Sequence, residues 1–297
     1  MNFRWLGKSD DGNTVTLQRL NECPLKSPDY YTQDWIQKNS DVIRRGVALD
    51  VETTGLQHQS CHIIEIALRE FFFNKSNGDV LSLGRSYESF QEPPTQIPDE
   101  IIQLTGITPE MVAGKNIDWN TVDTIIGDAH LVIAHNASFD RPFIDRHSKP
   151  SVEKVWACSH RQVDWKRHGF SSTKLELLNI YHGFFTDSHR AMNDVDALLY
   201  LLSLSGPFDG KSYLSELIEN ARRPSSQVVA SGAPFDSKDF LKQRGYSWDN
   251  TNRFWSKVIF KDQVSEEISW LESSVYFGSF RGFTRDFALT DSFKAQN

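Results

Sequence analysis

The sequence predicts a mixed α/β domain followed by a small α+β module, and three observations carry this prediction. Three apolar, β-branched runs follow one another between residues 43 and 90. Strand-like and helix-like segments then alternate as far as residue 206. A stretch rich in Pro, Ser and Gly at residues 219–234 separates this pattern from a shorter one at the carboxyl end. Strands first and then alternation with helices are typical of a mixed sheet flanked by helices.

The expected elements follow in chain order. Residues 1–42 have weak periodicity and several turn formers, so they form an N-terminal extension. The three predicted strands are GVALDVE (46–52), HIIEIALREFFF (62–73) and DVLSLGRSYESF (79–90), and a fourth is HLVIAHN (130–136). The predicted helices are IPDEIIQLTG (97–106), SFDRPFIDRHS (138–148), TKLELLNIYHG (173–183) and HRAMNDVDALLYLLSLSG (189–206). These elements give a main domain over residues 43–206, a linker over 207–225 and an accessory module over 226–297.

Composition places the chain among globular proteins. It is 39% hydrophobic and 24% charged, and no apolar run is long enough to cross a bilayer, so we expect no membrane partner. Its three cysteines, Cys23, Cys61 and Cys158, are far apart and odd in number. This pattern indicates a reducing compartment, and we predict a cytoplasmic location.

The formal net charge of −7 comes entirely from the first part of the chain. Residues 207–297 contain 12 Lys and Arg and 12 Asp and Glu, so the excess of acid lies in residues 1–206. Such an excess excludes a uniformly basic nucleic-acid-binding surface there. It is compatible with a centre built from carboxylates, because a bound metal ion reverses the local sign of the charge.

Two acids occupy one face of the first predicted strand. Side chains alternate along a strand, so Asp50 and Glu52 of VALDVETTGL point the same way. A buried carboxylate without a partner is costly, so these two acids need a base or a metal ion, unless they simply face solvent at the end of the strand.

Three more residues converge on the same place. Asp140 follows the fourth strand near the start of a helix, and His189 and Asp194 are five residues apart at the start of the last helix. On an ideal helix those two do not share one face, but both can face one cleft if His189 lies before or at the first turn. Four carboxylates in one cleft repel unless cations separate them, and oxygen ligands favour Mg²⁺ or Mn²⁺. Two such ions about 4 Å apart suit an in-line displacement at phosphorus, with the histidine as base.

The stretches DVETTGL, AHNASFD and HRAMNDVDA resemble the three motifs of the DEDDh 3′–5′ exonucleases, the DnaQ-like family, across residues 43–205. The resemblance implies a ribonuclease-H-like fold and the metal-dependent release of nucleoside 5′-monophosphates from a 3′ end. Asp50 would then bridge both metal ions. Glu52 and Asp194 would complete the site of the water-activating ion, Asp140 would hold the second ion, and His189 would be the general base.

The resemblance also implies a pocket for the terminal nucleotide. Backbone groups around Thr53 and Thr54 would receive the 3′-hydroxyl, and Leu56 would wedge beside the last bases. Asn136 and Phe139 would line the same pocket.

The carboxyl-terminal module is predicted to contain a hairpin. YSW and RFWSKVIF flank the turn DNTN, and alternation puts Arg253, Trp255 and Lys257 on one strand face. Bases interleaved with aromatic residues suit a platform that stacks nucleobases and contacts phosphates. The alternative is that so small a domain needs its aromatic residues for its own core.

We therefore expect a metal-dependent 3′–5′ exonuclease that acts on single-stranded DNA, with RNA as the alternative substrate. In a rival interpretation, the module tethers the nuclease to a polymerase or another repair protein.

Overall fold

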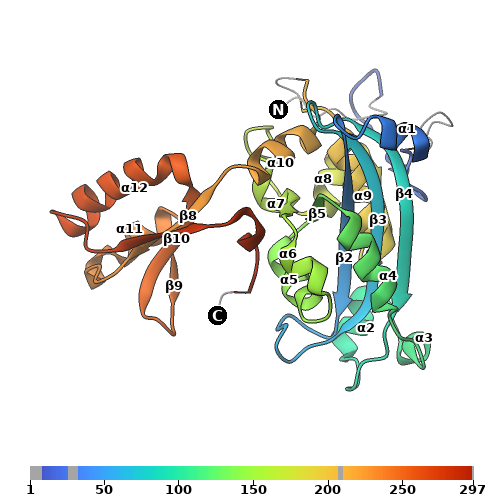
Figure 1. Cartoon of the computed structure of the whole chain (residues 1–297), viewed down its shortest axis with the longest axis horizontal. Helices are drawn as coiled ribbons and strands as arrows, with labels where there is room; N and C mark the ends of the chain where they lie inside the picture. The colour runs from blue at the N-terminus through green and yellow to red at the C-terminus, as the bar shows by residue number, and fades with distance from the viewer. Residues whose placement is uncertain (1–8, 26–32, 207–209, 296–297) are drawn as a thin grey trace. The chain divides into compact units, whose positions relative to one another are not determined.

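The computed structural model describes residues 9–25, 33–206 and 210–295. The chain divides into two compact units, one formed by Met1–Ala221 with Phe293–Asn297 and the other by Arg222–Ser292 (Figure 1). Within the described residues, no helix combines the length and the apolar character needed to cross a membrane.

A five-stranded mixed sheet organises the first unit. In spatial order its strands are β4 (Val80–Phe90), β3 (Ile63–Asn74), β2 (Ile43–Thr53), β5 (Leu131–Ala134) and β6 (Trp156–Cys158). Strands β2, β3 and β4 pair antiparallel, whereas β5 and β6 run parallel to β2. The sheet confirms the predicted mixed α/β class and the ribonuclease-H-like arrangement.

Helices cover both faces of this sheet (Figure 1). Side chains alternate along β2, so that Val47, Leu49 and Val51 join one apolar core and Ala48 joins the other. Helices α4 and α5 pack on the first core, and α8 and α9 pack on the second. The helices are α2 (Asp99–Thr105), α3 (Pro109–Val112), α4 (Trp119–Asp128), α5 (Ala137–Asp145), α6 (Lys149–Glu153), α7 (Ser159–Gln162), α8 (Leu175–Tyr181) and α9 (Ala191–Ser203).

The described part of the N-terminal extension packs on this domain. Its strand β1 (Gln18–Arg19) pairs parallel with β7 (Phe184–Phe185), and helix α1 spans Gln33–Lys38. Leu20 and Leu25 pack against the same core as α9. The extension therefore adds a small second sheet beside α8 and α9.

The predicted linker over residues 207–225 is wrong for most of its described length. Helix α10 (Tyr213–Ala221) occupies it and packs on α9, α7 and β6. Its apolar residues recur at helical spacing and are buried; they are Tyr213, Leu214, Leu217, Ile218 and Ala221. This periodicity outweighs the turn-forming composition on either side, so the first domain extends to residue 221.

The second unit is an antiparallel four-stranded sheet with two α-helices. The strands lie in the order β11 (Phe283–Phe287), β8 (Ser225–Ala230), β10 (Phe254–Phe260) and β9 (Ser247–Asp249). The helices are α11 (Lys238–Gln243) and α12 (Val264–Leu271), with shorter helical turns η1 (Phe235–Ser237), η2 (Lys261–Gln263), η3 (Glu272–Tyr276) and η4 (Leu289–Asp291). Phe254 pairs with Asp249, so β9 and β10 form the expected hairpin with a four-residue loop.

Candidate active site

The end of β2 carries the first two acids of the site. Strand β2 pairs with β5 through residues 46–48 and with β3 as far as Thr53, so β3 holds the end of the strand in place. Asp50 and Glu52 alternate with Val51, which belongs to the core on the opposite face. Both carboxylates therefore point to the side of the sheet on which α9 packs.

Helix α9 brings the third acid to this place. Asp194 lies in its first turn, and α9 packs across β2 and β3. One carboxylate oxygen each from Asp50, Glu52 and Asp194 lies within 4.8 Å of the others. Three hard oxygen ligands at this separation could hold one divalent metal ion.

The fourth acid, Asp140, comes from helix α5 in the other helical layer. It is buried in the first turn of α5, and its Oδ1 accepts a hydrogen bond of 3.3 Å from the backbone N–H of Val51. It lies outside the group formed by Asp50, Glu52 and Asp194. Its negative charge nevertheless reaches that group, because it contributes to raising the pKa of Asp50.

Burial raises the pKa of all four acids, and the charges of neighbouring acids raise the pKa of Asp50, Glu52 and Asp194 further. Burial first, and then the charges of the neighbouring acids, raise the pKa of Asp50 well above its ordinary value. Burial and then the charge of Asp194 raise the pKa of Glu52 to about 8. Burial raises the pKa of Asp140 and of Asp194 to about 7. A divalent cation would replace the protons of these acids, so the donor set fits the hard metal ion expected from the sequence.

The predicted base, His189, lies two residues before α9, whereas the predicted helix began at His189 itself. Its backbone is left-handed, with φ 65°, and its N–H donates a bond of 2.9 Å to Oδ2 of Asp194. The amide of Asn193 donates to the carbonyl of Asp187 at 3.0 Å, which ties the preceding loop to the helix. A non-glycine residue in this region costs about 1–2 kcal/mol, so these bonds hold an exposed side chain at the edge of the acid cluster.

Sequence reasoning missed two residues that fix the start of α9. Glu65 is buried and accepts bonds from Nη2 of Arg190 at 2.9 Å and from the backbone N–H of Ala191 at 3.0 Å. In the β2–β3 register Glu65 lies directly opposite Glu52. Two acids facing each other on paired strands require compensation, and this is the signal in the sequence that could have revealed Arg190.

The residues predicted to receive the terminal nucleotide lie after β2 and at the start of α5. Thr53 and Thr54 are buried, and their hydroxyls are used locally: Oγ1 of Thr53 donates to the carbonyl of Gly55, and Oγ1 of Thr54 accepts from the N–H of His62. Leu56 is 84% exposed, as a wedge would be.

The other two predicted pocket residues differ in exposure. Asn136 is exposed and immediately precedes α5, whereas Phe139 is half-buried and packs against the ring of Phe143 at 5.2 Å. Their roles toward a nucleotide stay predictions.

The predicted stacking platform is wrong, because Arg253, Trp255 and Lys257 do not form one exposed face. Trp255 packs against the core formed by α11, α12 and β8, and Nζ of Lys257 lies 3.6 Å from Glu267 of α12. Arg253 lies in the turn before β10, with φ 55°. The helices cover this face of the sheet because a small domain needs its aromatic residues for its own core.

Comparisons with known proteins agree with the motifs. The family model described as Exonuclease (RNase_T) matches residues 47–202. DNA polymerase III PolC-type of Staphylococcus aureus is 30% identical over 188 residues, which cover 58% of this chain and 12% of that protein. The chain thus spans about one eighth of the length of the curated relatives that it matches.

Two solved structures are similar at low sequence identity. Exonuclease X in complex with 5′ overhanging duplex DNA is 21% identical, with a TM-score of 0.40, and the match covers 57% of this chain and 99% of that one. E. coli exonuclease I in complex with a dA16 oligonucleotide is 15% identical, with a TM-score of 0.49, and the match covers 73% of this chain and 63% of that one. At these TM-scores neither likeness bears on the substrate of this chain.

Proposed function

Because the chain belongs to the exonuclease family, whose model spans residues 47–202, we propose that it removes nucleoside 5′-monophosphates one at a time from the 3′ end of a nucleic acid, by two-metal-ion hydrolysis. The observation that carries this proposal is the approach of three carboxylates to within 4.8 Å of one another beside a histidine-bearing loop. Nothing else in the described residues gathers as many potential metal ligands.

Each residue has a distinct part in this reaction. Asp50 would contact both ions, Glu52 and Asp194 would hold the ion next to the attacking water, and Asp140 would support the second ion. Two bound Mg²⁺ or Mn²⁺ ions supply a more acidic water and a stabilised leaving oxygen. His189 accepts the proton of the water, which its exposed position at the edge of the cluster allows.

We propose single-stranded DNA as the substrate, with RNA as the alternative. Support for DNA comes from the name of the polymerase relatives, and support for a single strand comes from the exposed Leu56, placed to pack against unpaired bases. The same relatives support association with a DNA polymerase, for which the second unit is the candidate contact. A cytoplasmic location belongs to this proposal as well.

The test is digestion of 3′-labelled DNA and RNA oligonucleotides, single- and double-stranded, with Mg²⁺ and with excess chelator. We expect labelled 5′-mononucleotides from single-stranded DNA only when the metal is present. Asp99→Asn in α2 is a matched control for substitutions of the cluster, because Asp99 is exposed. Full activity in excess chelator would contradict the metal-ion mechanism, and faster release from RNA would replace the DNA assignment.

A further inference from the structure

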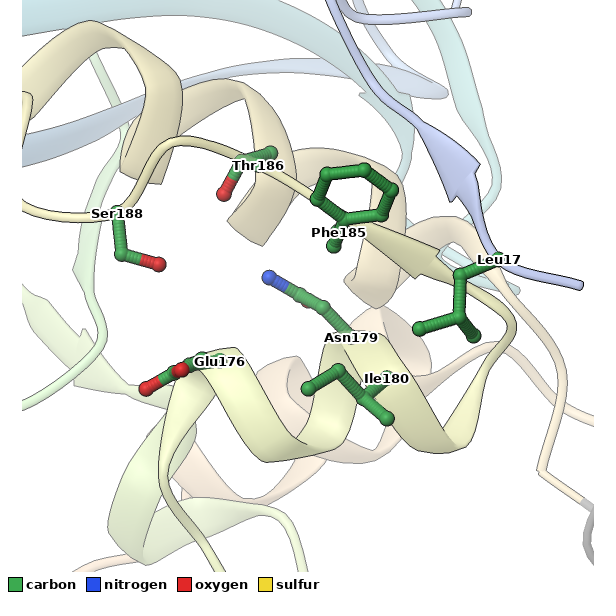
Figure 2. A pocket seen from close by; sticks show the side chains of 7 residues that line it. All are labelled: Leu17, Glu176, Asn179, Ile180, Phe185, Thr186 and Ser188. Carbon is green, nitrogen blue, oxygen red and sulfur yellow. The ribbon is translucent and has the colours of Figure 1, made fainter.

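A cavity of the first unit adjoins the segment that precedes His189. It has a volume of about 340 Å³ and is lined by α8, by the segment from β7 to Ser188, and by the N-terminal extension at Leu17 (Figure 2). The extension is held there by backbone bonds, from the N–H of Gln18 to the carbonyl of Gly183 and from that of Leu20 to the carbonyl of Phe185. This volume is at the lower end of the range for small-molecule sites.

Buried polar atoms face this cavity without a partner. Asn179 of α8 is 1% exposed, and neither its amide nitrogen nor its amide oxygen has a hydrogen-bond partner among the described residues. The same holds for Oγ1 of Thr186. In Figure 2 the amide of Asn179 points into the space between α8 and Thr186. Leaving such groups unsatisfied costs about 1–3 kcal/mol each, so the pocket needs an occupant that supplies hydrogen bonds.

We propose that this pocket binds one nucleobase. The Asn179 amide presents a donor and an acceptor side by side, the pattern that pairs with the edge of a base. Phe185, Ile180 and Leu17 provide apolar walls for the flat faces of a ring. Thr186, Ser188 and Glu176 add hydroxyl and carboxylate groups that can bond to amino or sugar hydroxyl groups.

The charge of the pocket excludes phosphate as the recognised group. Its lining contains one carboxylate, that of Glu176, and neither Lys nor Arg among the described residues. The ligand is therefore a base with at most its sugar. It comes either from a free nucleoside or from an unpaired base of the bound strand, and the second source rests on the proposed function.

A ligand in this pocket can affect catalysis, because the pocket adjoins the loop that carries His189. Ser188 lines the pocket and directly precedes His189, and Thr186 lies at the start of the same loop. A base bonded to Asn179 and Ser188 restricts this loop and with it the histidine.

Direct binding tests the pocket without any cleavage. Wild-type protein in chelator is titrated with adenosine, guanosine, cytidine and thymidine, and saturation-transfer NMR reports contact. Asn179→Leu and Thr186→Val, which keep the volume of each side chain, should each weaken nucleoside binding at least about tenfold. Asn120→Leu, at an exposed position in α4, should leave it unchanged. Because no metal ion or reaction takes part, this result is independent of the exonuclease proposal.

Kinetics on short and long oligonucleotides distinguish the two sources. If the base belongs to the strand, Asn179→Leu raises KM about tenfold on a 12-mer and leaves the KM of a dinucleotide unchanged. If the ligand is a free nucleoside, added nucleoside changes kcat of the wild type but not of Asn179→Leu. The proposal is overturned if wild type and Asn179→Leu agree in nucleoside binding and in both kinetic measurements, since the pocket then holds water alone.

Discussion

Two clusters of partly or fully buried carboxylates, one in each unit of this chain, are compensated in opposite ways. In the first unit, Asp50, Glu52 and Asp194 approach one another, and none forms an ion pair with a Lys or Arg among the described residues. In the second unit, the buried Glu267 lies 3.2 Å from Nη2 of Arg244 and 3.6 Å from Nζ of Lys257.

The difference distinguishes a functional site from a group of ion pairs that stabilises the fold. Breaking a paired buried charge leaves its partners stranded, so the Glu267 cluster serves the stability of the second unit. Unpaired acids in the first unit cost stability as long as no cation is bound. Strongly shifted pKa values in such a cluster are typical of functional sites. The comparison therefore predicts that substituting an acid of the Asp50, Glu52 and Asp194 cluster and substituting Glu267 have opposite effects on stability.

Asp50→Asn should have the largest effect on activity. The amide keeps the shape of the side chain but removes the charge that the metal ions need, so nucleotide release should fall below detection in the oligonucleotide assay. The same substitution removes the cost of burying an ionisable acid in this cluster, so the Tm of the metal-free protein should rise. Asp99→Asn should change neither quantity. If Asp50→Asn remained active, the acid cluster would not take part in the reaction.

His189→Ala should lower kcat by roughly 10²–10⁴-fold, the usual contribution of a general base. Substrate affinity, measured by filter binding in Ca²⁺, should change little, because the backbone bond of residue 189 to Asp194 does not need the ring. His130→Ala is the control, since His130 is also exposed and no catalytic part is assigned to it. Near wild-type turnover would leave His189 with a structural role only.

The parts of the site that the sequence predicted are those set by local periodicity. Alternation along a strand places Asp50 and Glu52 on one face, and the spacing of five residues brings His189 and Asp194 together at the start of one helix. These relations depend on neighbouring residues alone, and they hold whatever the rest of the fold does.

What could not be predicted depends on contacts distant in sequence. Glu65 meets Arg190 across 125 residues, and only the folded sheet brings them together. The alternation of side chains along a strand placed Trp255 and Lys257 on one face. It does not indicate which face of the sheet the helices cover. Helix α10 was missed because the composition of its flanks was given more weight than the periodicity of Leu214, Leu217 and Ile218.

Glu267→Ala should destabilise the second unit by about 1–3 kcal/mol, because Arg244 and Lys257, which are partly exposed, lose their shared buried partner. Glu266→Ala is the matched control, since Glu266 is the preceding residue of the same helix and is exposed. Urea unfolding followed by tryptophan fluorescence would measure both. Release of nucleotides from a very short oligonucleotide should persist in Glu267→Ala. If Glu267→Ala were as stable as the wild type, the ion pairs of Glu267 would contribute little to stability. The predicted contrast with the acid cluster of the first unit would then be wrong.

The last prediction concerns pH, and its sign follows from the raised pKa values. The folded protein holds protons on Glu52, with a pKa of about 8, and on Asp194, with a pKa of about 7, whereas an unfolded chain loses them near pH 4. Between about pH 4 and 8 the folded state therefore binds more protons than the unfolded state, and the free energy of unfolding of the metal-free protein falls as pH rises. The slope is at most about 1.4 kcal/mol per pH unit for each proton.

Saturating Mg²⁺ should abolish this slope, because the bound ion keeps the same carboxylates ionised at all of these pH values. Thermal unfolding from pH 4.5 to 8.5, with chelator and with Mg²⁺, measures the two slopes. Asp194→Asn should flatten the slope in chelator, whereas Asp99→Asn should leave it as in the wild type. Equal slopes for the wild type and Asp194→Asn would mean that Asp194 is already ionised without metal, which would contradict the raised pKa that sets this cluster apart from the ion-paired Glu267.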